Sequence, residues 1–245
     1  MVARLQGAII AAGHGERLRA GGESLPKPLV ELAGEPLLIR QTRSIVAAGA
    51  ETVLTVVNSE TARLIDQRAM KLPSALKISV RDTPNSMETL FALGERLSPG
   101  RFLLTTVDAI APPGELERFA SDALAALESD SDVAGVLGVN RWRGDRRPLF
   151  ASLGEDNSIA AFGDARSSMV TAGVYLFSTR IFELTEKARS AGCGALREFL
   201  AYLVAQRRRL KAIEIGEIID IDEISDLDAA HAMLEREELA KGRNA

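Results

Sequence analysis

Three observations predict an α/β fold in which a doubly wound, mainly parallel sheet lies in one domain spanning residues 1–245. Apolar segments rich in β-branched residues alternate with segments of helical period through residue 127, as in a parallel sheet with crossover helices. The segment 52–57 is apolar enough to be buried on both faces. No internal repeat or low-complexity linker divides the chain, and 46% of its residues are hydrophobic, enough for one large core.

The first half, residues 1–130, is expected to contain four strands separated by helices. The strands are the apolar segment beginning at Ala8 and the segments 52–57, 76–80 and 101–108. Because the carboxyl ends of parallel strands meet at one edge of a sheet, the loops that follow them are expected to form a single site.

Turn and capping residues set the expected limits of the helices between these strands. Pro36 suits the first turn of the first long helix, and Gly49 suits a left-handed residue at its end. Ser59 and Ser86 are the expected N-caps of the next two helices, and the helix after Ser59 is expected to extend its apolar face to Leu72.

The second half, residues 131–245, has a less regular pattern that includes a small β-hairpin region. Ser225 and Asp228 resemble a capping box that opens the last helix. The other predicted elements are strands over 132–139 and 170–177, a hairpin of 149–153 with 159–162, a charged loop over 142–148, helices near 179–190 and 195–207, and extended segments within 213–222.

Composition excludes several classes of protein. The net charge of −4 argues against broad, non-specific nucleic-acid binding. Cys193 is the only cysteine, so neither an intrachain disulfide nor a cysteine-rich zinc site is expected. No apolar run approaches the roughly 20 residues that cross a bilayer, and the N-terminus lacks a full signal-peptide pattern. We therefore expect a cytoplasmic protein that binds neither nucleic acid nor membrane; the pattern is silent on oligomeric state.

The stretch AAGHGERL, residues 11–18, followed by LPKPL, residues 25–29, is typical of a phosphate-binding loop. An apolar strand that feeds a glycine-containing turn presents backbone N–H groups to an anion. Pro26 and Pro28 are expected to hold Lys27 in a stiff, extended segment. The glycine pair alone also fits a tight strand-to-helix turn, and Leu18 replaces the third glycine of a dinucleotide-binding fingerprint.

These two motifs, together with LAGEPLL at residues 32–38, resemble the signature of nucleotidyltransferases that act on sugar-1-phosphates, choline phosphate and inositol phosphate. The resemblance implies the Rossmann-like fold of nucleotide-diphosphosugar transferases, with NTP bound mainly by 1–130 and the acceptor mainly by 131–245. It assigns the leaving β- and γ-phosphates to Arg17 and the charge at the α-phosphorus to Lys27. Contacts with the base and triphosphate are implied for Ala11, Ala12, Gly13 and Gly15.

The same resemblance implies a magnesium site built from aspartates. Asp108 ends an apolar strand, where the family places a metal-binding carboxylate; otherwise it caps the following turn. Asp220 and Asp222 share one face of an extended segment, and either can supply the second ligand, with Asp222 favoured over a simple helix cap. Carboxylates together with substrate phosphates are the ligands that Mg²⁺ prefers.

Four further residues have both a binding and a structural interpretation. Asn85, Ser86 and Thr89 stand where related enzymes hold the base and ribose, although capping explains a polar helix start equally well. Gly173 stands where related enzymes place the acceptor, although a strand bulge also explains a glycine there. His231 is expected to be half-buried on the last helix.

The combined expectation is an Mg²⁺-dependent enzyme that transfers a nucleotidyl group from an NTP, with CTP or UTP favoured, and releases pyrophosphate. Its acceptor is a phosphorylated sugar, polyol or amino-alcohol. Two alternatives are a non-catalytic nucleotide-binding or regulatory protein on the same fold and, disfavoured by Leu18, an NAD-dependent oxidoreductase.

Overall fold

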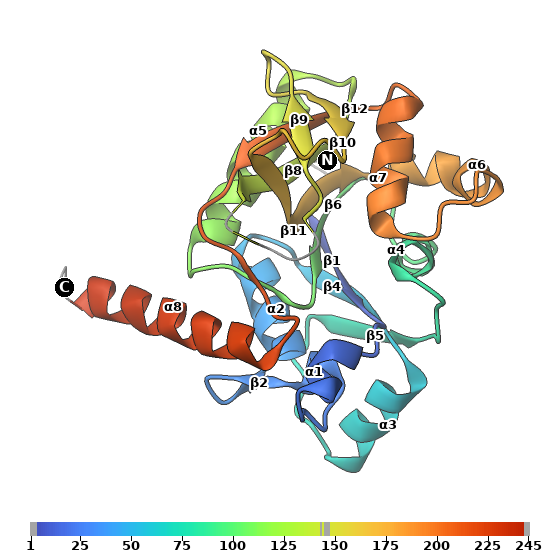
Figure 1. The fold of residues 1–245 in the computed structure, drawn as a ribbon. Coiled ribbons are helices and arrows are strands. Elements are labelled where there is room, and N and C mark those ends of the chain that lie inside the picture. The colour runs from blue at the N-terminus through green and yellow to red at the C-terminus, as the bar shows by residue number, and fades with distance from the viewer. Residues whose placement is uncertain (1–3, 143, 145–147, 243–245) are drawn as a thin grey trace.

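A computed structural model describes residues 4–142, 144 and 148–242. Its centre is a seven-stranded sheet in the order β12-β8-β11-β6-β1-β4-β5 (Figure 1). Among the described strands of this sheet, β11 runs antiparallel to both of its neighbours, and the other pairs are parallel. The strands are β1 (Gln6–Ala11), β4 (Thr52–Val57), β5 (Leu76–Val80), β6 (Arg101–Thr106), β8 (Val133–Arg141), β11 (Met169–Ser178) and β12 (Arg209–Glu214). The predicted mainly parallel α/β fold is confirmed.

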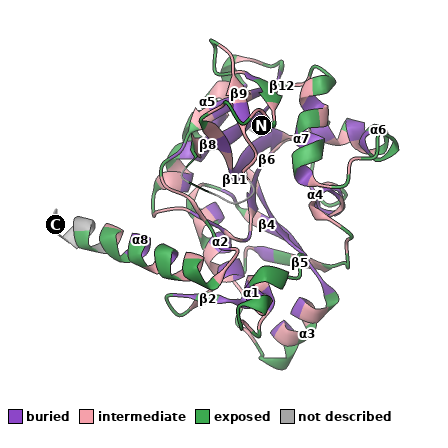
Figure 2. Ribbon diagram, viewed as in Figure 1, coloured by how far each residue is buried: buried purple, intermediate pink, exposed green. Residues whose placement is uncertain are grey.

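Helices cover both faces of the sheet. Successive residues of its strands point to opposite faces, and both sets are largely apolar. In β1, Ile9 packs in one core cluster, and Ala8 packs in a second cluster on the opposite face. Figure 2 shows the buried strands lying between the helices. The first cluster includes side chains of α2 (Leu37–Ala47), α5 (Glu115–Ser129) and α8 (Ile224–Gly242), and the second includes those of α4 (Ser86–Gly94) and α7 (Leu196–Ala205).

Shorter elements complete the fold, and one pair of them positions the site. Strand β13 (Ile219–Asp220) pairs antiparallel with β7 (Ala109–Ile110), which directly follows β6. This pairing carries a C-terminal segment to the carboxyl end of a strand from the first half. The remaining short elements are α1 (Glu16–Ala20), η1 (Lys27–Leu29), β2 (Glu31–Leu32), β3 (Glu35–Pro36), α3 (Ser59–Gln67), β9 (Ala151–Leu153), β10 (Ile159–Phe162), η2 (Thr179–Leu184) and α6 (Thr185–Ser190).

Several predicted details of the first half and the hairpin are confirmed. Gly49 follows α2 in a left-handed conformation with φ of 98°. The predicted hairpin of 149–153 with 159–162 forms as the antiparallel pair β9–β10. In the charged loop 142–148, residues 143 and 145–147 lie outside the described part of the chain.

Both N-caps were predicted one residue too far along the chain. The cap of each helix is the asparagine that precedes the predicted serine. The side chain of Asn58 accepts a hydrogen bond from Thr61 N at 2.8 Å, and that of Asn85 accepts one from Glu88 N at 2.9 Å. An Asn oxygen at the N-cap satisfies a free N–H of the first turn. Ser59 and Ser86 are therefore the first residues of α3 and α4 rather than their caps.

Two other helix limits also differ from the prediction. Helix α3 ends at Gln67, and Ala69 has a left-handed φ of 47°, so the apolar face does not continue to Leu72 as helix. Helix α8 begins at Ile224, before Ser225. Its capping acid is Asp226 instead of Asp228, because the Asp226 carboxylate accepts hydrogen bonds from the backbone N–H of residues 222 and 223.

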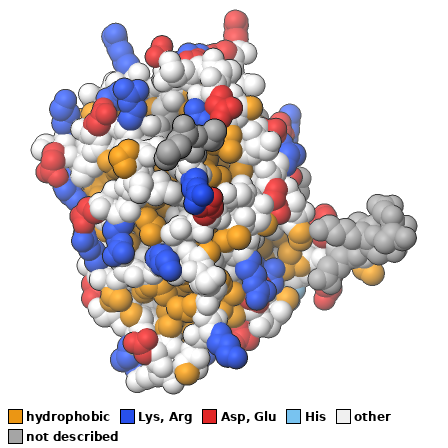
Figure 3. Space-filling model, turned by 180° about the vertical axis from the view of Figure 1, so that it is seen from behind, with side chains coloured by type: hydrophobic (Ala, Val, Ile, Leu, Met, Phe, Trp, Pro, Cys, Tyr) orange, Lys and Arg blue, Asp and Glu red, His pale blue; other side chains and the backbone are white. Residues whose placement is uncertain are grey.

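Among the described residues, no helix is both long enough and apolar enough to span a membrane. Figure 3 shows, on the face opposite that of Figure 1, basic and acidic side chains scattered among hydrophobic ones. Helix α8 projects from the body beyond its first turns (Figure 1).

Candidate active site

The loop between β1 and α1 brings the backbone close to Lys27. Gly15 has a left-handed φ of 67°, and a Cβ added to it would lie 3.1 Å from Lys27 Cβ, so this position requires glycine for both reasons. Leu18 is 1% exposed and packs in the first core cluster. The position of the third fingerprint glycine therefore holds a core side chain, which disfavours the dinucleotide-binding alternative.

Lys27 itself lies in a 3₁₀ turn, which differs from the predicted extended conformation. Pro26 is extended, with φ of −62° and ψ of 144°, and the turn η1 begins directly after it. Pro28 is tolerated in that first turn because the N–H that it lacks would have no helical partner there. The consequence for the site is the same: the two prolines fix the backbone on both sides of Lys27.

Two acidic and two basic side chains form the centre of the site, which we call the Lys27 cluster: Lys27, Asp108, Asp222 and Arg17. Lys27 Nζ donates to Asp108 Oδ2 at 2.7 Å and to Asp222 Oδ1 at 2.8 Å. Arg17 Nη2 lies 2.7 Å from Asp222 Oδ2. The Lys27 side chain is only 13% exposed. The structure thus brings together four predicted site residues from three distant segments of the chain.

The charges of this cluster support one another. Burial lowers the pKa of Lys27, but the carboxylates of Asp108 and Asp222 outweigh that effect and raise it above its ordinary value. Burial raises the pKa of Asp108, but the Lys27 ammonium, aided by a hydrogen bond from Thr106, brings it below its usual range. Lys27 is therefore a cation and Asp108 an anion at neutral pH.

Two cavities meet at the Lys27 cluster. The larger, about 510 Å³, is lined by the loop after β1, by residues 83–86 and 89, and by Lys27, Asp108 and Asp222. The predicted nucleotide contacts all line it: Ala11, Ala12, Gly13, Gly15, Asn85, Ser86 and Thr89. The second, about 350 Å³, shares Arg17, Ser86, Thr106, Asp108 and Asp222 and is also lined by Gly173 and Asp220. The shared side chains are therefore placed to contact groups in both cavities.

Sequence reasoning missed several residues of these walls. Thr83 and Pro84 line the first cavity, and Tyr175 and Arg197 line the second. Tyr175 stands two residues after Gly173 on a strand, so the period of two could have placed it on the same face. Arg197 comes from the first turn of α7, and no local pattern indicates its position.

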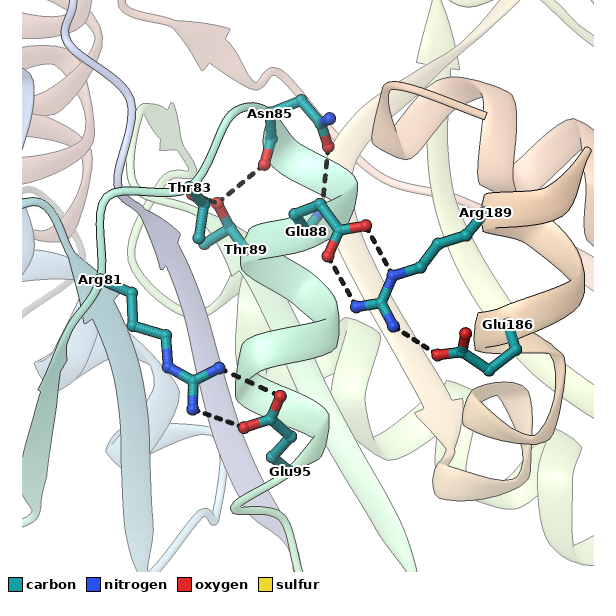
Figure 4. A network of polar contacts seen from close by, with 8 residues as sticks. All are labelled: Arg81, Thr83, Asn85, Glu88, Thr89, Glu95, Glu186 and Arg189. Atoms are coloured by element: carbon teal, nitrogen blue, oxygen red, sulfur yellow. Dashed lines mark hydrogen bonds and ion pairs between the residues drawn. The ribbon is translucent and has the colours of Figure 1, made fainter. Parts of the chain in front are cut away.

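Polar residues at the start of α4 are held in place by contacts that stabilise the beginning of the helix (Figure 4). Asn85 caps the helix, and the Thr89 hydroxyl donates to Asn85 O at 3.0 Å and lies 2.6 Å from the Thr83 hydroxyl. Ser86 Oγ accepts a hydrogen bond from Leu196 N at 2.9 Å and so joins α4 to α7. The cap is therefore Asn85 instead of the predicted Ser86, and Ser86 ties one cavity wall to the other.

A bidentate ion pair supports this wall from behind. Arg189 on α6 donates to both oxygens of Glu88, at 2.8 and 2.7 Å, and its guanidinium lies 5.2 Å from the centre of the Phe91 ring. Figure 4 shows the pair bridging α4 and α6. Planar fork-to-fork pairing fixes orientation as well as distance. Glu88 lies in the first turn of α4, next to Met87 and Thr89, so the ion pair orients that turn.

Gly173 forms a strand bulge, as one of its two interpretations predicts. The pairing of β11 with β8 shifts register between Thr171 and Tyr175, which places Gly173 in a bulge with φ of 70°. A Cβ at this position would lie 2.8 Å from Ala109 Cβ and 2.9 Å from Thr106 Oγ1. The glycine also lines the second cavity.

Asp222 and Asp220 occupy different places. Asp222 shares the Lys27 ammonium with Asp108, whereas Asp220 lines only the second cavity of the two. Among the described residues, no three His, Cys, Asp or Glu side chains converge as ligands for a metal. The two carboxylates on Lys27 nevertheless form a donor pair suited to Mg²⁺, which takes one or two carboxylates together with substrate phosphates.

His231 is half-buried, as expected, and joins two distant segments. Its Nε2 accepts a hydrogen bond from Ala33 N at 2.8 Å, and its Nδ1 lies 2.9 Å from Leu227 O. Ala33 is part of the turn between β2 and β3. This histidine therefore attaches α8 to the β2–β3 turn, away from the Lys27 cluster.

Comparison with known proteins identifies relatives of this chain. The chain is 29% identical over 192 residues to the bifunctional IPC transferase and DIPP synthase of Rubrobacter xylanophilus, covering 74% of this chain and 40% of that protein. It is 27% identical over 188 residues to the mannose-1-phosphate guanylyltransferase catalytic subunit beta of Drosophila pseudoobscura pseudoobscura, covering 73% of this chain and 49% of the relative. The chain thus spans about half the length of these relatives or less.

A solved structure shows the same fold. The inositol-1-phosphate CTP transferase of T. maritima superposes with a TM-score of 0.72 at 20% identity, covering 95% of this chain and 96% of that one. The MobA-like NTP transferase domain matches residues 7–210, which include most of β1, the phosphate loop, Lys27, Asp108 and Gly173. The chain therefore belongs to the MobA-like NTP transferase domain family.

Proposed function

We propose that this protein transfers a nucleotidyl group from an NTP, with CTP or UTP the favoured donor, to a phosphorylated sugar, polyol or amino-alcohol and releases pyrophosphate. The observation that supports this most is the position of the Lys27 cluster where two cavities meet. The larger cavity, built mainly by the first half of the chain, is assigned to the NTP, and the smaller one to the acceptor. Relatives named for work on inositol and mannose phosphates support the class of acceptor.

The chain's own residues suit this reaction. A phosphate monoester is already ionised at neutral pH, so the acceptor needs no general base to attack the α-phosphorus. Negative charge then grows on the phosphoryl oxygens, and fixed cations stabilise it without reorganising. Lys27, held by two prolines and two carboxylates, is assigned to the α-phosphate, and Arg17 to the leaving pyrophosphate.

Magnesium fits the donor set of the site. We assign its binding to Asp108 and Asp222, and Asp220 is the alternative to Asp222 as the second ligand. When bound, Mg²⁺ would neutralise phosphate charge and help to align the triphosphate. In its absence, the structure shows Lys27 and Arg17 balancing the carboxylate charges.

Removal of divalent metal is expected to abolish turnover without unfolding the protein. Excess EDTA should reduce pyrophosphate release by at least about 100-fold, because two fixed cations alone must then balance the charge of a triphosphate. Added Mg²⁺ should restore it. The melting temperature should change little, since ion pairs within the protein already satisfy both carboxylates. Full turnover in EDTA would refute a role for the metal.

A pyrophosphate-release screen tests the activity itself. Each of the four NTPs is combined with inositol-1-phosphate, phosphocholine, mannose-1-phosphate and glucose-1-phosphate. One donor and acceptor pair should exceed the others in kcat/KM by at least about tenfold, as expected where a site hydrogen-bonds the groups of its substrate. Absence of pyrophosphate with every pair, combined with tight NTP binding, would instead support the non-catalytic alternative.

The bridge between α4 and α6 gives a prediction about positioning. Arg189→Ala should raise the KM for the NTP by about 3–10-fold and change kcat less, because it loosens the first turn of α4 without touching the Lys27 cluster. Arg189→Lys should recover only part of the loss, since lysine cannot pair bidentately. Arg68→Ala, on an exposed turn, is the matched control. An unchanged KM in Arg189→Ala, or an equal rise in the control, would contradict this role.

A further inference from the structure

We propose a second anion site, formed by a cleft at the opposite end of the sheet, that binds a small organic di- or triphosphate. This cleft has a volume of about 600 Å³ and does not include any residue of the Lys27 cluster. It is formed where β6, β8 and β12 begin and β11 ends, and its charged lining residues are Arg101, Arg180, Arg207, Arg208 and Arg209 together with the acidic Glu128 and Asp132. We call this cleft, with all of its lining residues, the arginine cleft.

The position of the cleft separates it clearly from the candidate active site. Strand β6 starts at Arg101 in the cleft and leads to Asp108 in the Lys27 cluster, roughly 20 Å away at about 3.3 Å per residue. Strand β11 runs in the other direction, from Gly173 at the second cavity to Ser178 at the cleft. A ligand in the arginine cleft therefore does not overlap either cavity at the Lys27 cluster.

Three of the five arginines are held in place by the fold. Arg101 donates to Leu127 O at 3.2 Å and pairs with Glu128 at the same distance. Arg208 pairs with Glu183 at 3.2 Å. Arg209 pairs with Asp130 and, at 2.8 Å, with Asp156. These contacts hold the three guanidinium groups at the rim of the cleft, where the paired carboxylates offset their charge.

The other two arginines have no such partner. Within the described part of the chain, the guanidinium groups of Arg180 and Arg207 make no hydrogen bond or ion pair. Both side chains are exposed, and Arg207 has a left-handed φ of 57°, in the tight turn that leads into β12. The two unpaired guanidinium groups repel each other, and an anion bound between them would relieve that repulsion.

The chemistry of the cleft favours a polyphosphate with an organic part. Guanidinium groups pair bidentately with phosphate oxygens, and the two unpaired ones in this cleft can each pair with a different phosphate group of one ligand. The volume is within the range of small-molecule sites. Apolar side chains also line it, namely Leu127, Val133, Ala134 and Ile181, and these can contact a base or other apolar group.

Site-resolved chemical modification of the intact protein tests this proposal, with inorganic tripolyphosphate as the probe and EDTA present. Phenylglyoxal modification of each arginine is followed by mass spectrometry at constant ionic strength. Saturating tripolyphosphate should slow modification of Arg180 and Arg207 at least fivefold. Arg68 and Arg96 are exposed arginines outside the cleft and the cavities at the Lys27 cluster, and they should change less than twofold.

Calorimetric titration supplies the second measurement. Arg180→Ala/Arg207→Ala should weaken or remove one tripolyphosphate-binding event by at least tenfold, whereas Arg68→Ala/Arg96→Ala, which removes the same charge, should leave it within twofold. Equal slowing at all four arginines, no protection in the cleft, or equal effects of the two double variants would overturn the proposal. Neither readout uses NTP turnover, so the result stands whether or not the proposed transferase activity is found.

Discussion

Lys27→Ala is expected to lower kcat for pyrophosphate release by about 10²–10³-fold, the usual effect of removing one preorganised donor from developing charge. The ammonium lines the larger cavity and is held there by Asp108 and Asp222, whose carboxylates line both cavities. Because it is pre-positioned, its loss should appear mainly in kcat rather than in the KM for either substrate. Steady-state kinetics with the best donor and acceptor pair measure this.

The same substitution leaves two carboxylates without their shared cation, so stability has to be measured alongside activity. Breaking a buried ion pair by removing one partner typically destabilises by about 3–5 kcal/mol, and this largely buried pair should approach that range. Lys27→Arg keeps the charge but replaces the compact ammonium with a planar guanidinium, so it should restore folding more than turnover. Lys71→Ala, on an exposed loop, is the control. Near-normal kcat in folded Lys27→Ala protein would refute the proposed mechanism.

The residues that the sequence located well are those whose signals are local. Lys27 is marked by its flanking prolines, and Asp108 by its place just after an apolar strand. Parallel strands bring such positions to one edge, so their convergence could be predicted without the structure. Leu18, at the position of a fingerprint glycine, was also informative, because its burial excludes the tight glycine packing of a dinucleotide site.

What the sequence left open depends on contacts between distant segments. The different places of Asp220 and Asp222 follow from the pairing of β13 with β7, which leaves Asp222 beyond the strand and beside Lys27. No local pattern specifies that pairing. The ion pair of Glu88 with Arg189 joins residues 101 positions apart, and the arginine cleft collects side chains from four segments. The N-cap predictions failed for a different reason. Asn and Ser are both good N-cap residues, so residue type does not decide which of two adjacent candidates caps the helix.

Gly173→Ala is expected to destabilise the protein by about 2–4 kcal/mol, because it combines a left-handed φ with overpacking. The new Cβ would lie 2.8 Å from Ala109 Cβ and 2.9 Å from Thr106 Oγ1, and both neighbours are fixed by sheet pairing. Gly163→Ala is a matched control, since Gly163 has φ of 90° but open space around it. That variant should lose only about 1 kcal/mol. Equal losses in chemical denaturation would show that packing at residue 173 is unimportant.

Relief of the clash then separates the two interpretations of this glycine. In Gly173→Ala/Ala109→Gly the methyl group of residue 109 is gone, so part of the stability should return. If residue 173 serves only the bulge, the KM for the acceptor should return with it. We expect instead that this KM stays at least about threefold raised, because the added methyl group remains in the wall of the acceptor cavity and removes space from its substrate. The KM for the NTP should be nearly normal in the same variant, since Gly173 does not line the larger cavity.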